Sequence, residues 1–354
     1  ESYSKNITLR YPVYSHFSGE AGRLTFDNYC GTESITINKT SLLINNEFVF
    51  VTFENSSSVT IPAGERIVSD EIKCEVKAKT IFFVSFYLEN YTQMRSMVYA
   101  SGPLSTGIYA ISDCTNEKDI PINISRNTNN FYFLSNVSVL TQKENRCIVC
   151  YGDSITAQDW PNYLSLRCRE EGYEHTSVIR RATSGSRILR EYYDITYESY
   201  GLKGTNRFEH EVPTDGADTV IIQQGINDII HPVGVEINPF RPMSDMPTLE
   251  ELIDGMKYYI SKARSYGYKV YLGTLLPIEG WRTYADFREK LRNEFNNWMR
   301  TTDLVDGCID FDKALCNPDN PSAFLPIYDS GDHLHPSKEG YKKMAETVLA
   351  EILK

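Results

Sequence analysis

The hydrophobic pattern of the chain changes near residue 140, and this change limits the folds that the sequence can adopt. Before it, short runs rich in Val, Ile, Thr, Phe and Tyr alternate with polar turns, which is typical of a β-sandwich or jelly roll. After it, apolar strand-like runs alternate with helical stretches, which indicates a parallel sheet covered by helices. The sequence therefore predicts an all-β domain over 1–140, a polar linker over 141–146 and an α/β domain over 147–354.

The α/β part of the sequence can be divided into strands and helices by its hydrophobic periodicity. The expected strands are 147–152, 177–182, 219–223, 269–276 and 308–311, and the expected helices are 160–171, 248–266, 283–300 and 337–353. In a parallel sheet of this kind, ligands bind beyond the carboxyl ends of the strands. We therefore expect functional side chains directly after these strands.

Polar blocks occur where functional residues are expected. They are Gly152-Asp153-Ser154, Gly185, Gly225-x-Asn227-Asp228 and Asp332-x-x-His335. Each block alone is compatible with an ordinary turn or helix cap, so only their joint occurrence is informative. In order and separation they resemble the four marker blocks of the SGNH (GDSL) hydrolases, over about residues 147–354. The resemblance implies a flavodoxin-like three-layer α/β/α fold and ester hydrolysis through a serine nucleophile, with no cofactor.

The residue types in these blocks fit nucleophilic catalysis. A serine hydroxyl needs an adjacent base, and an imidazole has a suitable pKa for that role. Asp332 precedes His335 by three residues, a spacing that brings the two side chains to one side of a turn. Ser154, His335 and Asp332 are therefore the expected catalytic triad. The family resemblance implies an oxyanion hole formed by the backbone N–H groups of Ser154 and Gly185 and by the side-chain amide of Asn227.

A metal site is the rival interpretation of the last block. His333 and His335 have the His-x-His spacing of metallohydrolases, and Asp332 adjoins them. Asp153 and Asp228 would have to complete such a site from other strand ends. This interpretation leaves the serine, glycine and asparagine of the other blocks without a role, so we expect no metal and assign structural roles to Asp153 and Asp228.

Several features bear on the substrate. Trp160, Trp281 and His231, which lies in the long loop 229–246, are expected near the site and are candidates for substrate binding, although both tryptophans could instead pack helices onto the sheet. The segment 61–70 resembles, more loosely, the β-domain of two-domain carbohydrate esterases with an N-terminal jelly roll. The net charge of −11 argues against nucleic acid and favours a neutral over an acidic polysaccharide.

These features favour an acetylesterase acting on acetylated hemicellulose or its oligosaccharides. A lysophospholipase or thioesterase with a longer acyl pocket would use the same chemistry. A third hypothesis is a glycan-binding protein whose hydrolase fold is inactive. The sequence does not predict an oligomeric state.

The cellular compartment is less constrained by the sequence. Glycosylation sequons begin at Asn6, Asn38, Asn55, Asn90, Asn123 and Asn136, which favours a secreted or cell-surface protein, while a cytoplasmic one stays open. The apolar run 81–88 is far shorter than a membrane span, so no membrane insertion is expected. Eight cysteines are too few for a disulfide scaffold; Cys147 and Cys150 are expected in the core, and the spacing of Cys308 and Cys316 leaves their pairing open.

Overall fold

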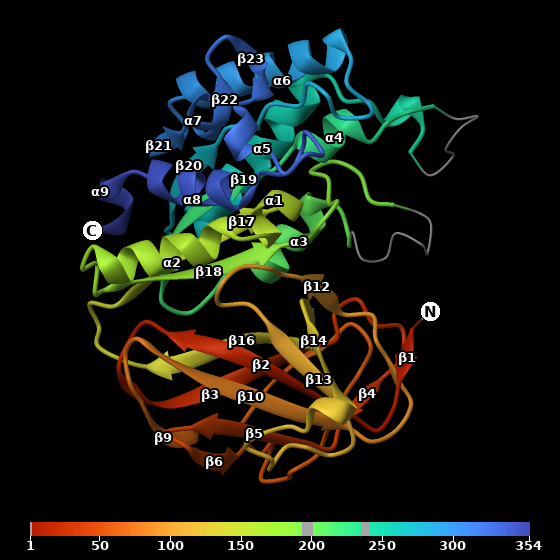
Figure 1. Cartoon of the computed structure of the whole chain (residues 1–354), viewed down its shortest axis with the longest axis vertical. Coiled ribbons are helices and arrows are strands. Elements are labelled where there is room, and N and C mark those ends of the chain that lie inside the picture. The colour runs from red at the N-terminus through yellow and green to blue at the C-terminus, as the bar shows by residue number, and fades with distance from the viewer. Residues whose placement is uncertain (1, 193–200, 235–240) are drawn as a thin grey trace. The chain divides into compact units, whose positions relative to one another are not determined.

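The computed structural model describes residues 2–192, 201–234 and 241–354. The chain folds into two compact units, Glu1–Asn145 and Arg146–Lys354, drawn from red to yellow and from green to blue in Figure 1. The short segment expected as a linker contributes to both units. The Thr141 hydroxyl donates a hydrogen bond to the Ser18 carbonyl at 2.7 Å, and Arg146 begins the first strand of the second unit.

The first unit is an antiparallel all-β structure. Its larger sheet has the order β14 (Ser125–Thr128), β13 (Gly107–Ile111), β2 (Ile7–Ser15), β10 (Thr80–Leu88), β5 (Lys39–Ile44) and β6 (Glu47–Phe50). The second sheet has the order β16 (Leu134–Leu140), β3 (Gly19–Asp27) and β8 (Arg66–Val68), and β9 (Ile72–Val76) also pairs with β3. The first unit also contains three separate two-stranded sheets: β1 (Tyr3–Ser4) with β11 (Thr92–Gln93), β4 (Ile35–Ile37) with β7 (Val59–Ile61), and β12 (Met97–Tyr99) with β15 (Asn130–Tyr132).

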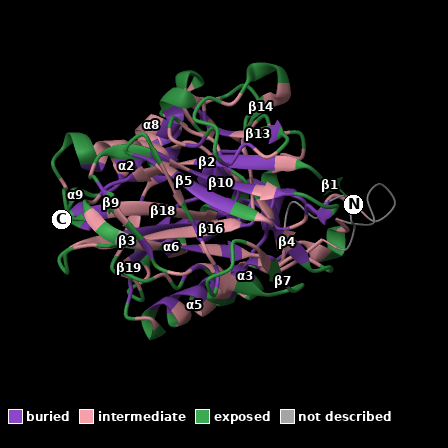
Figure 2. Cartoon of the chain, turned by 90° about the horizontal axis from the view of Figure 1, so that it is seen from below, coloured by how far each residue is buried: buried purple, intermediate pink, exposed green. Residues whose placement is uncertain are grey.

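The two larger sheets of this unit share one hydrophobic core. Phe82, Val84 and Phe86 alternate along β10 and are buried, because successive side chains of a strand point to opposite faces. Leu24 and Phe26 of β3 belong to the same core, and buried residues are purple in Figure 2. The predicted antiparallel all-β class is therefore confirmed, and jelly-roll connectivity stays a prediction.

The second unit contains a five-stranded parallel sheet. Its order is β18 (Thr176–Ala182), β17 (Arg146–Gly152), β19 (Ala217–Gln223), β20 (Lys269–Gly273) and β21 (Gly307–Ile309). In chain order this is 2-1-3-4-5, the flavodoxin-like arrangement, and the predicted α/β class is confirmed. The strand order reverses between β17 and β19, so a crevice is expected at the carboxyl ends of these two strands.

Helices connect the strands of this sheet. They are α1 (Ser154–Ala157), α2 (Trp160–Glu170), α3 (Gly204–Glu211), α4 (Ile226–Ile230), α5 (Leu249–Ser265), α6 (Asp286–Thr301), α7 (Phe311–Leu315), α8 (Lys338–Thr347) and α9 (Ala350–Leu353). The start of α5 follows from a capping box, in which Thr248 and Glu251 satisfy each other's backbone N–H groups. No helix among the described residues is both long and apolar enough to cross a membrane.

The last helix differs from the prediction of one continuous helix over 337–353. It breaks between α8 and α9, where Val348 and Leu349 are extended. The Arg167 guanidinium donates hydrogen bonds to the carbonyls of Ala345 and Val348, at 3.0 and 2.6 Å. These carbonyls are therefore satisfied without a further helical turn, by a residue distant in sequence.

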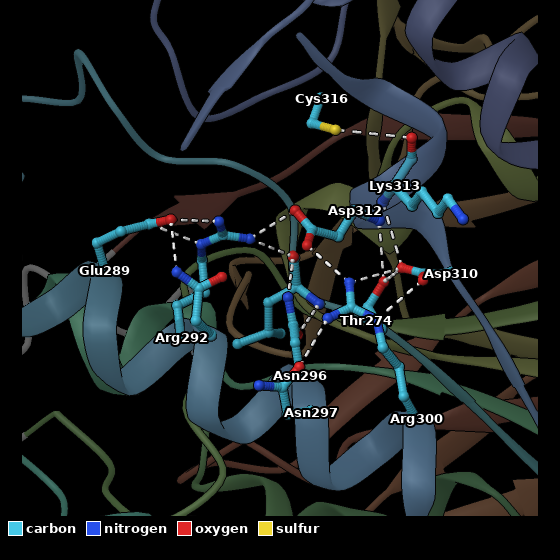
Figure 3. Close-up of polar contacts among 12 residues, drawn as sticks. Thr274, Glu289, Arg292, Asn296, Asn297, Arg300, Asp310, Asp312, Lys313 and Cys316 are labelled. Atoms are coloured by element: carbon cyan, nitrogen blue, oxygen red, sulfur yellow. Dashed lines mark hydrogen bonds and ion pairs between the residues drawn. The ribbon is translucent and has the colours of Figure 1, made fainter. Parts of the chain in front are cut away.

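A largely buried polar cluster, in which Arg300 and Asp310 are partly exposed, lies at the carboxyl ends of β20 and β21 (Figure 3). We call it the α6 network; it consists of Thr274, Glu289, Arg292, Asn296, Arg300, Asp310 and Asp312. Arg292 pairs with Glu289 at 2.6 Å and with Asp312 at 2.7 Å. Asn296 accepts the N–H of Leu275 and donates to its carbonyl, which ends β20 before the predicted residue 276.

The cysteines lie as the sequence suggested. All eight are free thiols, and Cys147 and Cys150 are buried on β17. Cys308 and Cys316 form no disulfide in this structure.

Candidate active site

Ser154 is held at the carboxyl end of β17 by a tight strand-to-helix turn. Asp153 caps α1, and its Oδ1 accepts the backbone N–H of Ile155 at 3.1 Å. A Cβ on Gly152 would lie 2.3 Å from the Gln223 carbonyl oxygen, so glycine is needed for β17 and β19 to pair here. The Ser154 N–H, the first of α1, donates to no other described residue.

The last block forms a closed loop before α8. A bridge between Asp329 and Pro336 joins its ends. Within it, Asp332 Oδ1 accepts the backbone N–H groups of Leu334 and His335, at 2.9 and 2.8 Å. Asp332 Oδ2 lies 2.7 Å from His335 Nδ1. One carboxylate therefore fixes both the backbone and the ring of His335.

The three predicted triad residues are brought together. Ser154 Oγ lies 2.8 Å from His335 Nε2. Because the Asp332 carboxylate accepts a hydrogen bond from the Nδ1–H group, the neutral ring has its lone pair at Nε2 and can accept the serine proton. Partial burial opposes the charge of Asp332, yet the hydrogen bonds from the His335 ring and backbone outweigh it and hold the pKa below its ordinary value. The arrangement is suited to activating a hydroxyl nucleophile.

The two other predicted oxyanion donors come from neighbouring strand ends. Gly185 follows β18 with a φ of +75°, a conformation that glycine adopts readily, and its N–H donates to no other described residue. Asn227 is buried on α4, and its Nδ2 donates to the Ser186 carbonyl at 3.0 Å. This contact was not predicted, and it ties the amide to the glycine segment. An amide nitrogen has a second hydrogen, which remains for an oxyanion.

Both structural aspartates are buried. Asp228 accepts the N–H groups of Ile188 and Leu189, at 2.8 and 3.0 Å, so it anchors the segment after Gly185. Burial raises the pKa of Asp228 to about 6, although these N–H groups act against the rise. Burial likewise raises the pKa of Asp153 to about 7, and its Oδ2 has no hydrogen-bond partner. Asp153 is thus a buried carboxyl next to Ser154, the predicted nucleophile, and only one of its oxygens has a hydrogen-bond partner.

The sequence did not predict a set of buried polar side chains that contacts the Ser186 hydroxyl. The Ser186 hydroxyl accepts hydrogen bonds from Arg207 and from Gln224, both at 2.9 Å. Arg207 also pairs with Glu211 at 2.7 Å, and Tyr259 donates to Gln224 at 2.6 Å. The available signals were the Arg207–Glu211 spacing of four residues and a glutamine pair directly after a buried strand.

The two candidate tryptophans differ in position. Trp160 is fully buried and packs against Phe311 with ring centroids 5.5 Å apart. It is therefore a core residue, and the prediction that it contacts substrate is wrong. It lies on one helical face with Leu164 and Cys168, and that spacing was the signal for packing. Trp281 is partly exposed, and the Arg282 guanidinium lies 4.6 Å from its ring centroid. Of the two candidate tryptophans, Trp281 is the one whose ring is accessible to a ligand.

His231 is buried at the end of α4, so little of its surface is accessible for the predicted contact with substrate. Its Nδ1 is paired with the Tyr192 hydroxyl, which also lies 3.0 Å from the Gly185 carbonyl. Burial, with the charges of Arg241 and other arginines, lowers the pKa of His231 well below its ordinary value. His231 is therefore a neutral ring packed behind the glycine segment. Residues 235–240 of the long loop lie outside the described residues.

The His-x-His pair does not converge on one point. His333 Nδ1 lies 2.6 Å from Asp329 Oδ2, whereas His335 Nδ1 bonds Asp332. No group of three or more His, Cys, Asp or Glu side chains arranged to hold a metal ion is found in the parts of the chain that the structure describes.

Comparisons with known proteins find one family model and several similar solved structures. A family model described as "GDSL-like Lipase/Acylhydrolase family" matches residues 150–343. Similar solved structures include a GDSL-like lipase from Bacteroides thetaiotaomicron, 18% identical, covering 60% of this chain and 90% of that one with a TM-score of 0.44. An acetyl xylan esterase, AlAXEase, is 19% identical and covers 58% and 99%, with a TM-score of 0.42. A variant of the acetyl xylan esterase Axe2 from Geobacillus stearothermophilus is 18% identical and covers 58% and 94%, with a TM-score of 0.43.

No curated protein sequence matches the chain at a significant level. The family model alone spans more than half of the chain and includes Ser154, Gly185, Asn227, Asp332 and His335. The chain belongs to the GDSL-like lipase and acylhydrolase family.

Proposed function

We propose that this acylhydrolase is a serine esterase that removes acetyl or other short acyl groups from carbohydrate, with acetylated hemicellulose or its oligosaccharides as substrate. The observation that most supports ester hydrolysis is the hydrogen-bonded series from Ser154 Oγ through His335 to Asp332, with contacts of 2.8 and 2.7 Å. It is the constellation that activates a serine by general-base catalysis.

The first half of the reaction forms an acyl-enzyme. Ser154 Oγ attacks the ester carbonyl carbon while His335 Nε2 accepts the serine proton. The tetrahedral intermediate then collapses, the bond to the alcohol oxygen breaks, and His335 Nε2 gives its proton to that oxygen. Asp332 stabilises the imidazolium during these steps and keeps Nδ1 protonated.

The second half releases the acid. A water molecule gives a proton to His335 Nε2 as its oxygen attacks the acyl carbon, and the bond to Ser154 Oγ breaks with return of that proton. In both halves the negative oxygen would receive hydrogen bonds from the N–H groups of Ser154 and Gly185 and from the Asn227 amide. Donors of this kind contribute about 3–4 kcal/mol each to lowering the barrier.

The polar character of the residues around the site supports a hydrophilic alcohol. Trp281 with Arg282 over its ring, and the half-exposed His333, lie in segments after β20 and before α8. An aromatic face beside charged and polar groups suits a sugar ring, which has apolar faces and a hydroxyl rim. A longer acyl chain would instead need an extended apolar wall.

Acetate release from a panel of acetylated polysaccharides tests the proposal. We expect release from acetylated xylan or mannan by the wild type and none above background by Ser154→Ala. Turnover of p-nitrophenyl acetate without release from any polysaccharide would reject the carbohydrate substrate and keep the esterase.

The rival function, hydrolysis of long-chain esters or thioesters, is separated by acyl length. We expect a higher kcat/KM for p-nitrophenyl acetate than for p-nitrophenyl octanoate. A preference for the octanoate would favour a lysophospholipase or thioesterase.

A hemicellulose substrate implies that the protein works at the cell surface or after secretion. The sequon residues Asn55, Asn90 and Asn123 are exposed, as glycan attachment would require. A loss of mass after treatment of the natural protein with an N-glycosidase is the expected result.

A further inference from the structure

The loop before α8 contains the same aspartate–histidine arrangement twice. Asp332 binds the backbone N–H and the Nδ1 of His335. Asp329 binds the backbone N–H of His333 at 3.1 Å and its Nδ1 at 2.6 Å. Two histidines, two residues apart, are therefore oriented by two separate carboxylates. Only one of them reaches Ser154, and the mechanism leaves the other without a role.

His333 has a positive φ, which is uncommon for residues other than glycine, although histidine adopts it more often than most. Its φ is +62°, in the left-handed region where glycine and asparagine are favoured. Its ring packs against Gly280, where a Cβ would lie 2.6 Å from the His333 Cγ. A turn alone would be formed with less strain by glycine, and strained residues of this kind concentrate at functional sites.

The contacts of the His333 ring leave one edge open. Nδ1 is bound to Asp329, and Cγ and Cδ2 face Gly280, while 49% of the side chain is exposed. Nε2 has no hydrogen-bond partner among the described residues. Because the carboxylate of Asp329 holds the proton at Nδ1, the neutral ring has an acceptor lone pair at Nε2.

The chemistry of the site determines which half of an ester lies near this edge. His335 must protonate the departing alcohol oxygen, so the alcohol half lies on the side of the loop that carries His335. His333 belongs to the same closed loop and packs against the residue before Trp281. Of the two halves of the ester, the alcohol half is the one that must approach His335, and His333 lies two residues before it in the same loop.

We infer that His333 determines specificity for the alcohol half of the ester, by accepting at Nε2 a hydrogen bond from a free hydroxyl group. This inference rests on the proposed serine esterase. The ligand class is a polyhydroxy alcohol with an esterified and a free hydroxyl, which includes partly acetylated sugars and glycerol monoesters. Aryl esters, which lack such a hydroxyl, do not use this contact.

Two variants distinguish a role of His333 in binding the substrate hydroxyl from a role in stabilising the turn. His333→Asn keeps a donor for Asp329 and tolerates a positive φ, but it has no group at the position of Nε2. His333→Gly relaxes the turn and removes both contacts. Each is assayed with p-nitrophenyl acetate, glycerol monoacetate and acetylated xylo-oligosaccharide, with Ser154→Ala as the inactive reference.

We expect both variants to raise KM for glycerol monoacetate and the xylo-oligosaccharide about 5–10-fold, since one hydrogen bond is lost. Their kcat on these substrates, and all constants for p-nitrophenyl acetate, should stay within about twofold of the wild type. Equal losses on all three substrates, normal behaviour of His333→Asn beside an impaired His333→Gly, or no change in either variant would overturn the inference. A wild type that cleaves glycerol monoacetate but not the xylo-oligosaccharide would reject only the carbohydrate proposal.

Discussion

Two polar clusters lie at the carboxyl edge of the same parallel sheet, and they differ in how fully their groups are paired. In the α6 network, Arg292 is fully engaged by Glu289, Asp312 and the Leu275 carbonyl. In the cluster around β17 and β19, Asp153 Oδ2 has no partner, and the N–H of Ser154 donates to no described residue. The second cluster is the one that contains Ser154, the proposed nucleophile.

This difference teaches that burial and charge do not by themselves mark a site. A paired buried network fixes backbone geometry, and it has no group to offer a reacting molecule. A buried polar group without a hydrogen-bond partner lowers the stability of the fold. Such groups are expected where a ligand or a transition state supplies the missing hydrogen bond. The predictions below test this division, beginning with the largest effect.

Ser154→Ala should lower kcat on p-nitrophenyl acetate by about 10⁴–10⁶-fold, because the attacking oxygen is removed. Steady-state kinetics measures the loss, and circular dichroism checks the fold. Ser165→Ala, at a nearly buried serine of α2, is the matched control and should retain wild-type activity. Residual activity of Ser154→Ala above one percent of the wild type would place the nucleophile elsewhere.

Arg292→Met should act on stability alone. Glu289 and Asp312 would lose their shared cation in a buried setting, which costs about 3–5 kcal/mol in the free energy of unfolding. Urea denaturation measures this loss. Kinetic constants of the folded fraction should match the wild type, and a large fall in kcat with unchanged stability would contradict the structural role of the α6 network.

A pair of buried asparagines offers the sharpest comparison between the clusters. Asn227 and Asn296 each donate Nδ2 to a strand-end carbonyl, at 3.0 and 2.9 Å. Asn227→Ala should lower kcat by about 10²–10³-fold, since an oxyanion donor is lost. Asn296→Ala should destabilise the fold and leave kcat unchanged. Equal kinetic effects in the two variants would remove the distinction.

The effect that is smallest for each step in pH concerns Asp153. Its folded pKa of about 7 lies above the ordinary value of 3.8, so the folded protein binds more protons than the unfolded chain between these pH values. The contribution of Asp153 to the free energy of unfolding is therefore present at low pH and is lost as the pH rises toward 7. The wild type should lose stability relative to Asp153→Asn over that range, by at most about 1.4 kcal/mol per pH unit. Denaturation series at several pH values measure the difference, and a pH-independent difference would show that Asp153 is not buried as a neutral acid.

The sequence predicted the parts of the molecule that depend on local pattern. The strands of the parallel sheet follow from short apolar runs. Ser154 lies in the tight turn directly after one of them, and Asp332 and His335 lie in the loop before α8, as their blocks predicted. Elements that depend on distant contacts were not predictable in this way. The break after α8 requires Arg167, and the short helix α4 is fixed by buried contacts such as that of Asp228 with Ile188 and Leu189.

Trp160 shows a different limit. Its closeness to Ser154 in sequence suggested closeness to the substrate, but the face of α2 on which it lies decides its environment. Similarly, the whole-chain charge of −11 does not describe the surroundings of His231, where nearby arginines contribute to its lowered pKa. The position of a residue in the sequence and the total charge of the chain therefore predict the environment of a side chain less well than its individual contacts do.

The central claim is that Ser154 is an activated nucleophile, and covalent labelling tests it most directly. The wild type is incubated with a serine-directed fluorophosphonate, and the labelled peptide is mapped by mass spectrometry. We expect one label per chain on Ser154, with loss of esterase activity in proportion, and no label on Ser154→Ala. Absence of label on Ser154 in a folded protein, or full activity after its labelling, would contradict the account.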